Sequence, residues 1–405
     1  MLRSLPIASG LLLAAGLALS LAACAPRTAS KPEPAATPVP QRTAPAPRLG
    51  LVDPNRPVLV AVLAPLSSSD PGATAIGNAL ANAARMAAVD LADPTMELRF
   101  YDTAGDPATA RLAAAKAVGD GAALILGPLF SASTGAVRGA ASDARINVVS
   151  FSTDSQAAGG PVFVSGFLPE GAARRIVGFA ASQGYDRLAV FYPRNDYGNA
   201  ARRGAEAAAP SSGARVMVAT GYPRTFHGIQ DTAGLFAETA LAAGVTALLL
   251  PDRGQGLRSA AAFVDYNGLN PARMKYLGLG QWNAAETLQE PALHGGWFPA
   301  PDPARFEQFA SLYAARHGAR PPFIAVLGYD AVQVAGQLLA EARRSGSRTP
   351  FGRAELTRFE GFQGALGPLR FEHSGTSIRA LAILQAGPEG FEVLDPAPYR
   401  LDIGS

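Results

Sequence analysis

One stretch of the chain, residues 122–153, constrains the fold more than any other. Its two short apolar runs, AALILG and INVVSF, are typical of strands that are buried on both faces of a parallel sheet. Between these runs Val137, Ala141 and Ala144 recur at helical spacing, which predicts an intervening helix. Alternation of buried strands with helices is the pattern of an α/β protein with a mainly parallel sheet.

Hydroxyl residues follow both of these predicted strands. Ser131 and Ser133 follow the first strand, and Ser152 and Thr153 follow the second. Ligands of open α/β sheets bind beyond the carboxyl ends of the strands, and a helix N-terminus offers free backbone N–H groups to an anion. The two strand ends are therefore a candidate site for a carboxylate or another small polar anion. The alternative is that Ser133 or Thr134 only caps the helix.

Strands and helices alternate along most of the remaining chain. Apolar runs predict further strands at residues 58–63, 96–103, 161–166, 186–192, 216–221, 245–250 and 274–279. Helical spacing predicts helices at residues 76–91, 107–118, 171–183, 303–317 and 324–344. Asp106 is expected to cap its helix, with Pro107 in the first position. A chain of 405 residues, 48% of them hydrophobic, can bury the cores of two such domains.

Residues 166–169 and 295–298 are expected to be the first two of three crossovers between two lobes. Residues 361–393 are expected to contain the third crossover and the closing strands of the second lobe. Three crossings between two compact lobes describe a hinge-bending clamshell. The predicted fold class is therefore α/β, with two doubly wound lobes of mainly parallel sheets joined by three hinge crossovers. The expected domain ranges are 56–167 plus 299–346 for the first lobe, and 168–298 plus 347–405 for the second lobe.

The first residues are similar to a bacterial lipoprotein signal. Arg3 supplies a positive charge, and residues 11–21 form an apolar run that is shorter than a membrane span. The run ends in Leu-Ala-Ala-Cys, which resembles the lipobox, so we expect residues 1–23 to be a signal peptide and Cys24 to be lipidated. Cys24 is the only cysteine, so no intramolecular disulfide can form. The alternative is a plain signal peptide with an incidental cysteine.

A Pro-rich segment separates Cys24 from the first predicted strand. Residues 24–55 are rich in Pro, Ala, Thr and Arg, a composition that builds no core and favours an extended, semi-rigid tether. Ala25 and Pro26 follow the cysteine where an aspartate would be expected for retention at the inner membrane. By resemblance to known sorting rules, this favours a lipid anchor in the outer membrane, on the periplasmic face of the cell envelope.

Charge and motifs argue against several functional classes. The formal net charge is +3, and the arginines form no basic stripe, so nucleic-acid binding is not expected. The four histidines have no metal-site spacing, and the chain contains neither a nucleophile elbow nor a phosphate-binding loop. We therefore expect no catalytic residues, no cofactor and no metal.

Several motifs occur in the order found in a known family. The segments APLSSSD, FYDTAGDPATARLAAAKAV, LILGPLFSAST and INVVSFSTD resemble the leucine-binding class of type I periplasmic binding proteins, over residues 57–395. Within that class GPLFSAS, FSTD, GFLPE, DYG, GQWN and GGWF resemble lipoproteins called penicillin-binding-protein activators. The resemblance implies the two-lobed clamshell with three hinge crossovers and a ligand cleft between the lobes.

The resemblance also implies which residues face the cleft. In the leucine-binding class an acidic residue of the second lobe binds the ligand ammonium, and Gln281 occupies that position here. A glutamine cannot neutralise an ammonium, so weak binding of free α-amino acids is expected unless Asp154 or Asp252 points inward. The expected cleft residues are Ser131, Ser133, Ser152, Thr153, Tyr197, Asp252 and Gln281.

Two functions fit these features. The first is a non-enzymatic extracytoplasmic lipoprotein that regulates a peptidoglycan synthase, in the manner of the penicillin-binding-protein activators. The alternative is the substrate-binding subunit of an ABC importer for amino acids or related small polar solutes. The expected partners are thus the membrane, through the lipid anchor, a synthase or an ABC permease, and a small polar ligand. The signal, the tether and the hinge suit both functions, because a fold alone does not decide a function.

Overall fold

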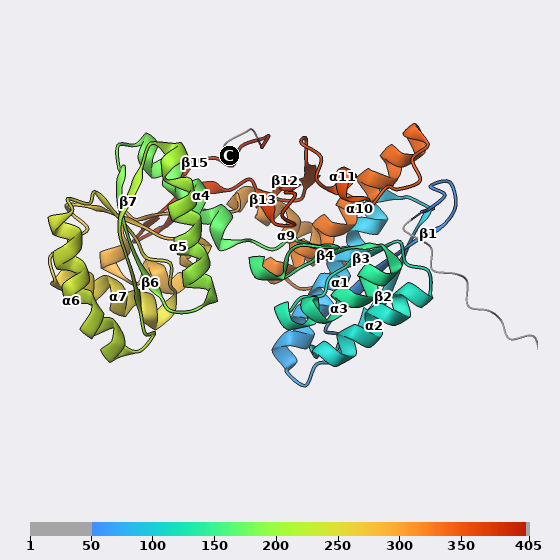
Figure 1. The fold of residues 1–405 in the computed structure, drawn as a ribbon, viewed down its shortest axis with the longest axis horizontal. Coiled ribbons are helices and arrows are strands. Elements are labelled where there is room, and N and C mark those ends of the chain that lie inside the picture. Colours follow the sequence, from blue (N-terminus) through green and yellow to red (C-terminus); the bar gives the residue numbers. More distant parts are fainter. Residues whose placement is uncertain (1–50, 402–405) are drawn as a thin grey trace, which may run out of the picture. The chain divides into compact units, whose positions relative to one another are not determined.

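The computed structural model describes residues 51–401, so the predicted signal peptide, Cys24 and most of the tether lie outside the described residues (Figure 1). Two large sheets dominate this part of the chain. The first contains five parallel strands in the order β2-β1-β3-β4-β5. Its strands are β1 (Val58–Ala64), β2 (Met96–Asp102), β3 (Leu124–Leu126), β4 (Asn147–Ser150) and β5 (Val162–Val164). The predicted strand–helix–strand unit at residues 122–153 is confirmed as β3, α3 (Ser131–Ala144) and β4.

The second sheet contains seven strands in the order β15-β14-β10-β9-β8-β6-β7. Its parallel strands are β6 (Arg187–Pro193), β7 (Arg215–Tyr222), β8 (Ala247–Leu249), β9 (Lys275–Leu277) and β10 (Trp297–Ala300). The antiparallel strands β14 (Ala382–Gly387) and β15 (Gly390–Asp395) complete one edge. The predicted class, two lobes with mainly parallel sheets, is confirmed.

Helices cover both faces of each sheet. The helices of the first lobe are α1 (Pro71–Leu91), α2 (Pro107–Gly119), α3, α9 (Pro303–His317), α10 (Val326–Ser345) and the short α11 (Arg353–Leu356). Those of the second are α4 (Pro169–Ser182), α5 (Asp196–Ala208), α6 (Phe226–Ala242), α7 (Gly254–Tyr266) and the short α8 (Ala285–Leu288). As predicted, Asp106 caps α2, because its carboxylate accepts a hydrogen bond of 2.7 Å from the Thr109 N–H.

The apolar runs of the strands follow from burial on both faces. Along β1, Val60 and Val62 pack into the cluster that contains α1 and α10, whereas Leu59 and Ala61 pack into the cluster that contains α2 and α3. Successive side chains of a strand point to opposite faces, so a strand covered on both sides contains no polar alternation. Each face of the second sheet has its own apolar cluster as well.

Helix α10 returns late in the sequence to pack against α1, and the orange and blue ribbons lie together in Figure 1. The helical stretch Phe323–Ser345 has the length and apolar composition of a membrane span. Two-thirds of its most apolar window is buried within the protein, however, so the helix belongs to the core. Gly328 allows the two helices to approach closely, since a Cβ there would lie 2.2 Å from the Leu80 carbonyl oxygen.

The first crossover has the predicted position, because β5 ends at Val164 and α4 begins at Pro169. The prediction for the second crossover is wrong. Residues 295–298 lead into and begin β10, where Trp297 and Phe298 are both buried. The crossing therefore comes after Ala300. The apolar residues from Trp297 onward form a strand between β9 and β14.

The segment that begins at residue 347 also differs from the expectation. We assigned it to the second lobe, yet Phe351, Leu356 and Leu369 belong to the same apolar cluster as β1 and α10. Strands β11 (Phe362–Gly364), β12 (Gly367–Phe371) and β13 (Ser377–Arg379) form a small separate antiparallel sheet. Phe362 and Phe371 of this sheet cover the first-lobe core, whereas Ile378 of β13 packs into an apolar cluster of the second lobe. The third crossover is therefore confined to the residues between β13 and β14.

Candidate functional site

A cavity of about 900 Å³ lies between segments of the two lobes. The first lobe contributes Thr153 and residues of α9 and α10, and the second lobe contributes Tyr197, Gln281 and Asn283. The first crossover lines the same cavity through residues 166–169. Cavities of this size at an interface between domains are typical of small-molecule sites.

A smaller, more polar cavity of about 310 Å³ adjoins the first one, and the two share Thr153, Pro169 and Tyr197. Ser131 and Asp154 line the smaller cavity. The Ser131 hydroxyl donates a hydrogen bond to the Asp154 carboxylate, which also accepts one of 2.9 Å from the Gln156 N–H. Four predicted cleft residues, Ser131, Thr153, Tyr197 and Gln281, thus line one or both cavities.

Ser133 and Ser152, which we also expected in the cleft, do not line either cavity. Both side chains are buried: the Ser152 hydroxyl accepts a hydrogen bond of 3.1 Å from the Asp154 N–H, and the Ser133 hydroxyl has no hydrogen-bond partner among the described residues. The alternative, helix capping, is not observed either. Phe130 is the N-cap of α3, and the Thr134 hydroxyl donates to the Phe130 carbonyl at 3.0 Å.

Asp252, which we also expected in the cleft, does not line either cavity. Its carboxylate accepts hydrogen bonds from the Tyr222 hydroxyl at 2.9 Å and from Arg224 Nε at 2.8 Å, and only 2% of the residue is exposed. The backbone N–H of Arg253 donates to the same carboxylate at 2.7 Å. A buried carboxylate needs such partners, so Asp252 supports the loop before α7.

Tyr197 presents a neutral hydroxyl to the cavity. Burial raises the pKa of Tyr197 well above its ordinary range, while the Gln281 backbone N–H and the positive charge of Arg253 act in the opposite direction. Burial dominates, because transfer of a phenolate out of water is unfavourable. The hydroxyl can therefore donate a hydrogen bond to a ligand oxygen at neutral pH.

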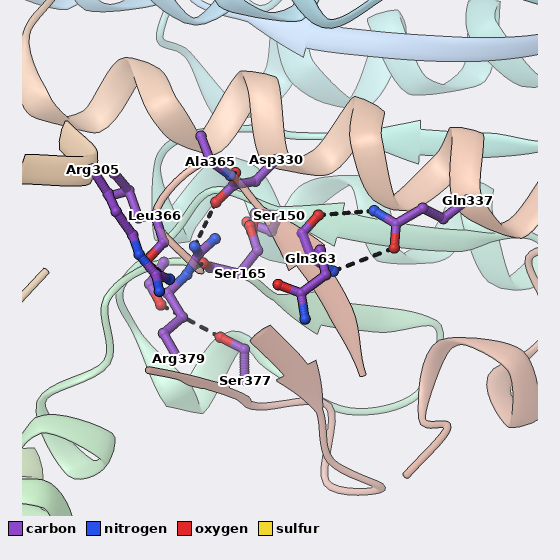
Figure 2. A network of polar contacts seen from close by, with 11 residues as sticks. Ser150, Ser165, Arg305, Asp330, Gln337, Gln363, Ala365, Leu366, Ser377 and Arg379 are labelled. Atoms are coloured by element: carbon purple, nitrogen blue, oxygen red, sulfur yellow. Dashed lines mark hydrogen bonds and ion pairs between the residues drawn. The ribbon is translucent and has the colours of Figure 1, made fainter. Parts of the chain in front are cut away.

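Sequence reasoning missed a buried ion pair at the edge of the larger cavity, between Arg379 and Asp330 (Figure 2). Arg379 Nη1 lies 2.6 Å from Asp330 Oδ2, and Arg379 Nε donates to the Ser165 carbonyl at 2.9 Å. Asp330 Oδ1 accepts from the Ala365 N–H at 2.7 Å. The pair links α10, the residue after β5 and the end of β13. The one available signal was an aspartate within the otherwise apolar face of α10.

Among residues 51–401, no group of three or more His, Cys, Asp and Glu side chains is arranged to hold a metal ion. The lining of the two cavities combines hydroxyl, amide, guanidinium and carboxylate groups with apolar side chains. Such an arrangement can bind and orient an organic solute.

The family model described as periplasmic binding protein matches residues 57–390 of the chain. No curated protein matches the sequence significantly. A solved structure from Rhodospirillum rubrum, described as a putative branched-chain amino acid ABC transporter, is similar with a TM-score of 0.70 at 18% identity, over 84% of this chain and 100% of that one.

Two further solved structures have the same fold. An ABC transporter substrate-binding protein from Sphaerobacter thermophilus is similar with a TM-score of 0.64 at 18% identity, over 85% of this chain and 98% of that one. A solute-binding protein of an ABC transporter from Rhodopseudomonas palustris, in complex with 3,4-dihydroxybenzoic acid, has a TM-score of 0.56 at 17% identity, over 85% and 97% of the two chains.

Proposed function

Because this chain belongs to the periplasmic binding protein family, we propose that it is an extracytoplasmic solute-binding protein that delivers a small polar solute to an ABC permease. The observation that carries the proposal is the cavity of about 900 Å³, which has Thr153 on one lobe and Tyr197 and Gln281 on the other. A ligand held by groups of both lobes stabilises their closed arrangement, which a permease can recognise.

The similar structures support this reading, which was the alternative at the level of sequence, over the synthase regulator. They are described as parts of ABC transporters, and the protein from Rhodopseudomonas palustris holds a small carboxylic acid. Members of the family bind solutes without transforming them, so the proposed activity is binding and not catalysis.

Calorimetric titration of the purified protein with a panel of amino acids, small organic acids and other polar solutes tests the proposal. We expect a micromolar or tighter dissociation constant for at least one solute. Replacing Thr153 by Val and Tyr197 by Phe should then weaken binding by about 1–3 kcal/mol, because a polar ligand group loses its partners. Thr232→Val on α6, away from both cavities, is the control. A fully folded protein that binds no solute of the panel contradicts the importer function.

We further propose that Cys24 carries the lipid and that the Pro-rich segment holds the protein away from the membrane surface. Stable membrane attachment requires more than one acyl chain, as bacterial lipoproteins have. Cys24→Ser should abolish labelling with a radioactive fatty acid and prevent lipoprotein-type processing of the signal peptide. Unchanged labelling of the variant would refute the anchor.

The second candidate function is regulation of a peptidoglycan synthase. Two features favour it: the motifs shared with penicillin-binding-protein activators, and the residues after Cys24, which favour the outer membrane and so a location away from an inner-membrane permease. Crosslinking in intact cells separates the two functions. Capture of a permease supports the importer, whereas capture of a synthase supports the regulator.

A further inference from the structure

Four charged side chains line the larger cavity: Arg253, Glu307, Arg320 and Arg379. Three of them already have partners of opposite charge. Arg320 forms two hydrogen bonds to the Glu307 carboxylate, at 2.9 and 2.6 Å, and Arg379 is paired with Asp330. Within the part of the chain that the structure describes, Arg253 is the charged lining residue whose side chain has neither an ion pair nor a hydrogen bond.

The backbone around Arg253 is held firmly. Its N–H donates to the buried Asp252 carboxylate, and its carbonyl accepts a hydrogen bond of 2.9 Å from Arg224 Nη2. The side chain itself is exposed, and it lines the larger cavity together with Tyr197. The cavity therefore offers a guanidinium and a neutral phenol group, a combination that suits a carboxylate.

The rest of the lining is largely aromatic and aliphatic. The ring centroids of Phe167 and Phe323 are 4.8 Å apart, and those of Phe323 and Phe306 are 5.1 Å apart. These rings form a continuous aromatic wall in the cavity, extended by Ile324 and Leu327. A wall of this kind stabilises a flat apolar ring by burial and by offset or edge contacts.

The cavity has no unpaired carboxylate for a ligand ammonium among its described lining residues, since Glu307 is bound to Arg320. Two further carboxylates, Asp154 and Asp196, line the adjoining smaller cavity. There Asp154 already accepts hydrogen bonds from Ser131 and Gln156, and Asp196 is exposed to solvent in the first turn of α5. Enclosure of an unpaired ammonium in the larger cavity would be strongly unfavourable.

We propose that the larger cavity selects monocarboxylates with an apolar, ring-bearing body over zwitterionic amino acids, and that Arg253 binds the carboxylate while the Phe167–Phe323–Phe306 wall contacts the ring. This inference rests on the proposed function in that it takes the cavity to be a solute site. The inference assigns a class of ligand to the cavity and names Arg253 as the residue that selects for a negative charge.

A set of three ligands with the same phenylpropyl skeleton tests the inference: 3-phenylpropanoate, phenylalanine and 3-phenylpropan-1-amine. In calorimetric titrations of the full protein, we expect the carboxylate to bind at least ten-fold more tightly than either of the others. Arg253→Gln should weaken binding of the carboxylate by about ten- to a hundred-fold, the usual effect of losing one charge-assisted hydrogen bond. Arg258→Gln is the matched control, because Arg258 lies on α7 but outside both cavities.

Four results would overturn the inference. Equal or tighter binding of phenylalanine would show that Asp154 or Asp196 neutralises the ammonium. Binding of a sugar or another uncharged solute, with none of the three probes bound, would refute the ligand class and leave the solute-binding function intact. No binding of any solute would refute both. Retained affinity of the Arg253→Gln variant for 3-phenylpropanoate would move the carboxylate site away from Arg253.

Discussion

Asp102, at the end of β2, organises the loop that follows β1. Its carboxylate accepts hydrogen bonds from the backbone N–H groups of Leu66 and Ala104, each at 2.8 Å, and from the Ser67 hydroxyl. Burial acts to raise the pKa of Asp102, but the hydrogen bonds from Ser67, Ala104 and Leu66 outweigh it, and the pKa lies below its ordinary value. One ionised side chain thus fixes the ends of two neighbouring strands.

This lowered pKa predicts a pH dependence. A carboxylate whose pKa is lower in the folded state stabilises the protein above its unfolded-state pKa, and the contribution is lost as pH falls through the folded-state pKa. Asp102→Asn should reduce the free energy of unfolding at pH 7 by about 1–3 kcal/mol and reduce the further loss below about pH 4. Urea titrations at several pH values measure this. Asp143→Asn, an exposed position on α3, is the control. An unchanged pH profile in the Asp102 variant would contradict the prediction.

At the same scale, sequence reasoning found hydroxyl and amide residues of the cleft but not the direction of each side chain. Ser152 and Thr153 are neighbours, yet one is buried and the other lines both cavities. Asp252 and Arg253 differ in the same way, because the first is tied to Tyr222 and Arg224. Adjacent residues after a strand face different surroundings, and the backbone dihedral angles at that point decide which side chain faces the cavity. The sequence alone does not give these dihedral angles.

At the scale of elements, a single glycine allows two helices of the first lobe to pack closely. Gly328 on α10 lies against the backbone of Leu80 on α1, and a Cβ would approach the Leu80 carbonyl carbon to 3.0 Å as well as its oxygen to 2.2 Å. Neither atom can move independently of its helix. The contact therefore sets the separation of α1 and α10.

Gly328→Ala is predicted to destabilise the protein by about 1–3 kcal/mol, because the helices must separate to admit the methyl group. Gly139→Ala is the matched control. Gly139 lies in helix α3 with no atom within 4 Å of an added Cβ, so alanine there should stabilise the protein by about 0.5–1 kcal/mol through backbone entropy. Guanidinium denaturation of the two variants measures both effects. Similar changes in the free energy of unfolding of the two variants would show that the close approach of α1 and α10 does not require glycine at position 328.

The helices and strands could be predicted from the sequence where their buried apolar residues are continuous or recur regularly. Strands covered on both faces, such as β1 and β8, appear as uninterrupted apolar runs, and α9 has the predicted bounds. Errors arose where a residue type has two uses. The glycines before Trp297 were interpreted as a crossover, although they precede a buried strand. Residues 362–371 were assigned to the second lobe because their partner, the apolar surface of α10, is formed by distant sequence.

At the scale of the whole molecule, the residues that join the lobes are held by one buried ion pair. Arg379 precedes the third crossover, its Nε binds the Ser165 carbonyl at the start of the first crossover, and its guanidinium lies 4.8 Å from the centroid of Phe167. Asp330 anchors this arginine to α10 and also binds the Ala365 N–H. Two of the three connections between the lobes thus converge on a single interaction (Figure 2).

Removing one partner of this pair is predicted to be more harmful than replacing both. The side chains of Arg379 and Asp330 are only 6% and 1% exposed, so Arg379→Met leaves a buried carboxylate without its counter-charge. The expected cost is about 3–5 kcal/mol, as for other broken buried pairs, whereas the double variant Arg379→Met with Asp330→Leu should recover most of that loss. Arg320→Gln, which breaks the exposed pair with Glu307, should change stability little.

Denaturant titrations of the single and double variants give the coupling energy directly. Additive losses would mean that each residue acts through its backbone contacts alone. A positive coupling, together with weaker solute binding in the single variant, would mean that the ion pair sets the geometry in which the two lobes meet the ligand.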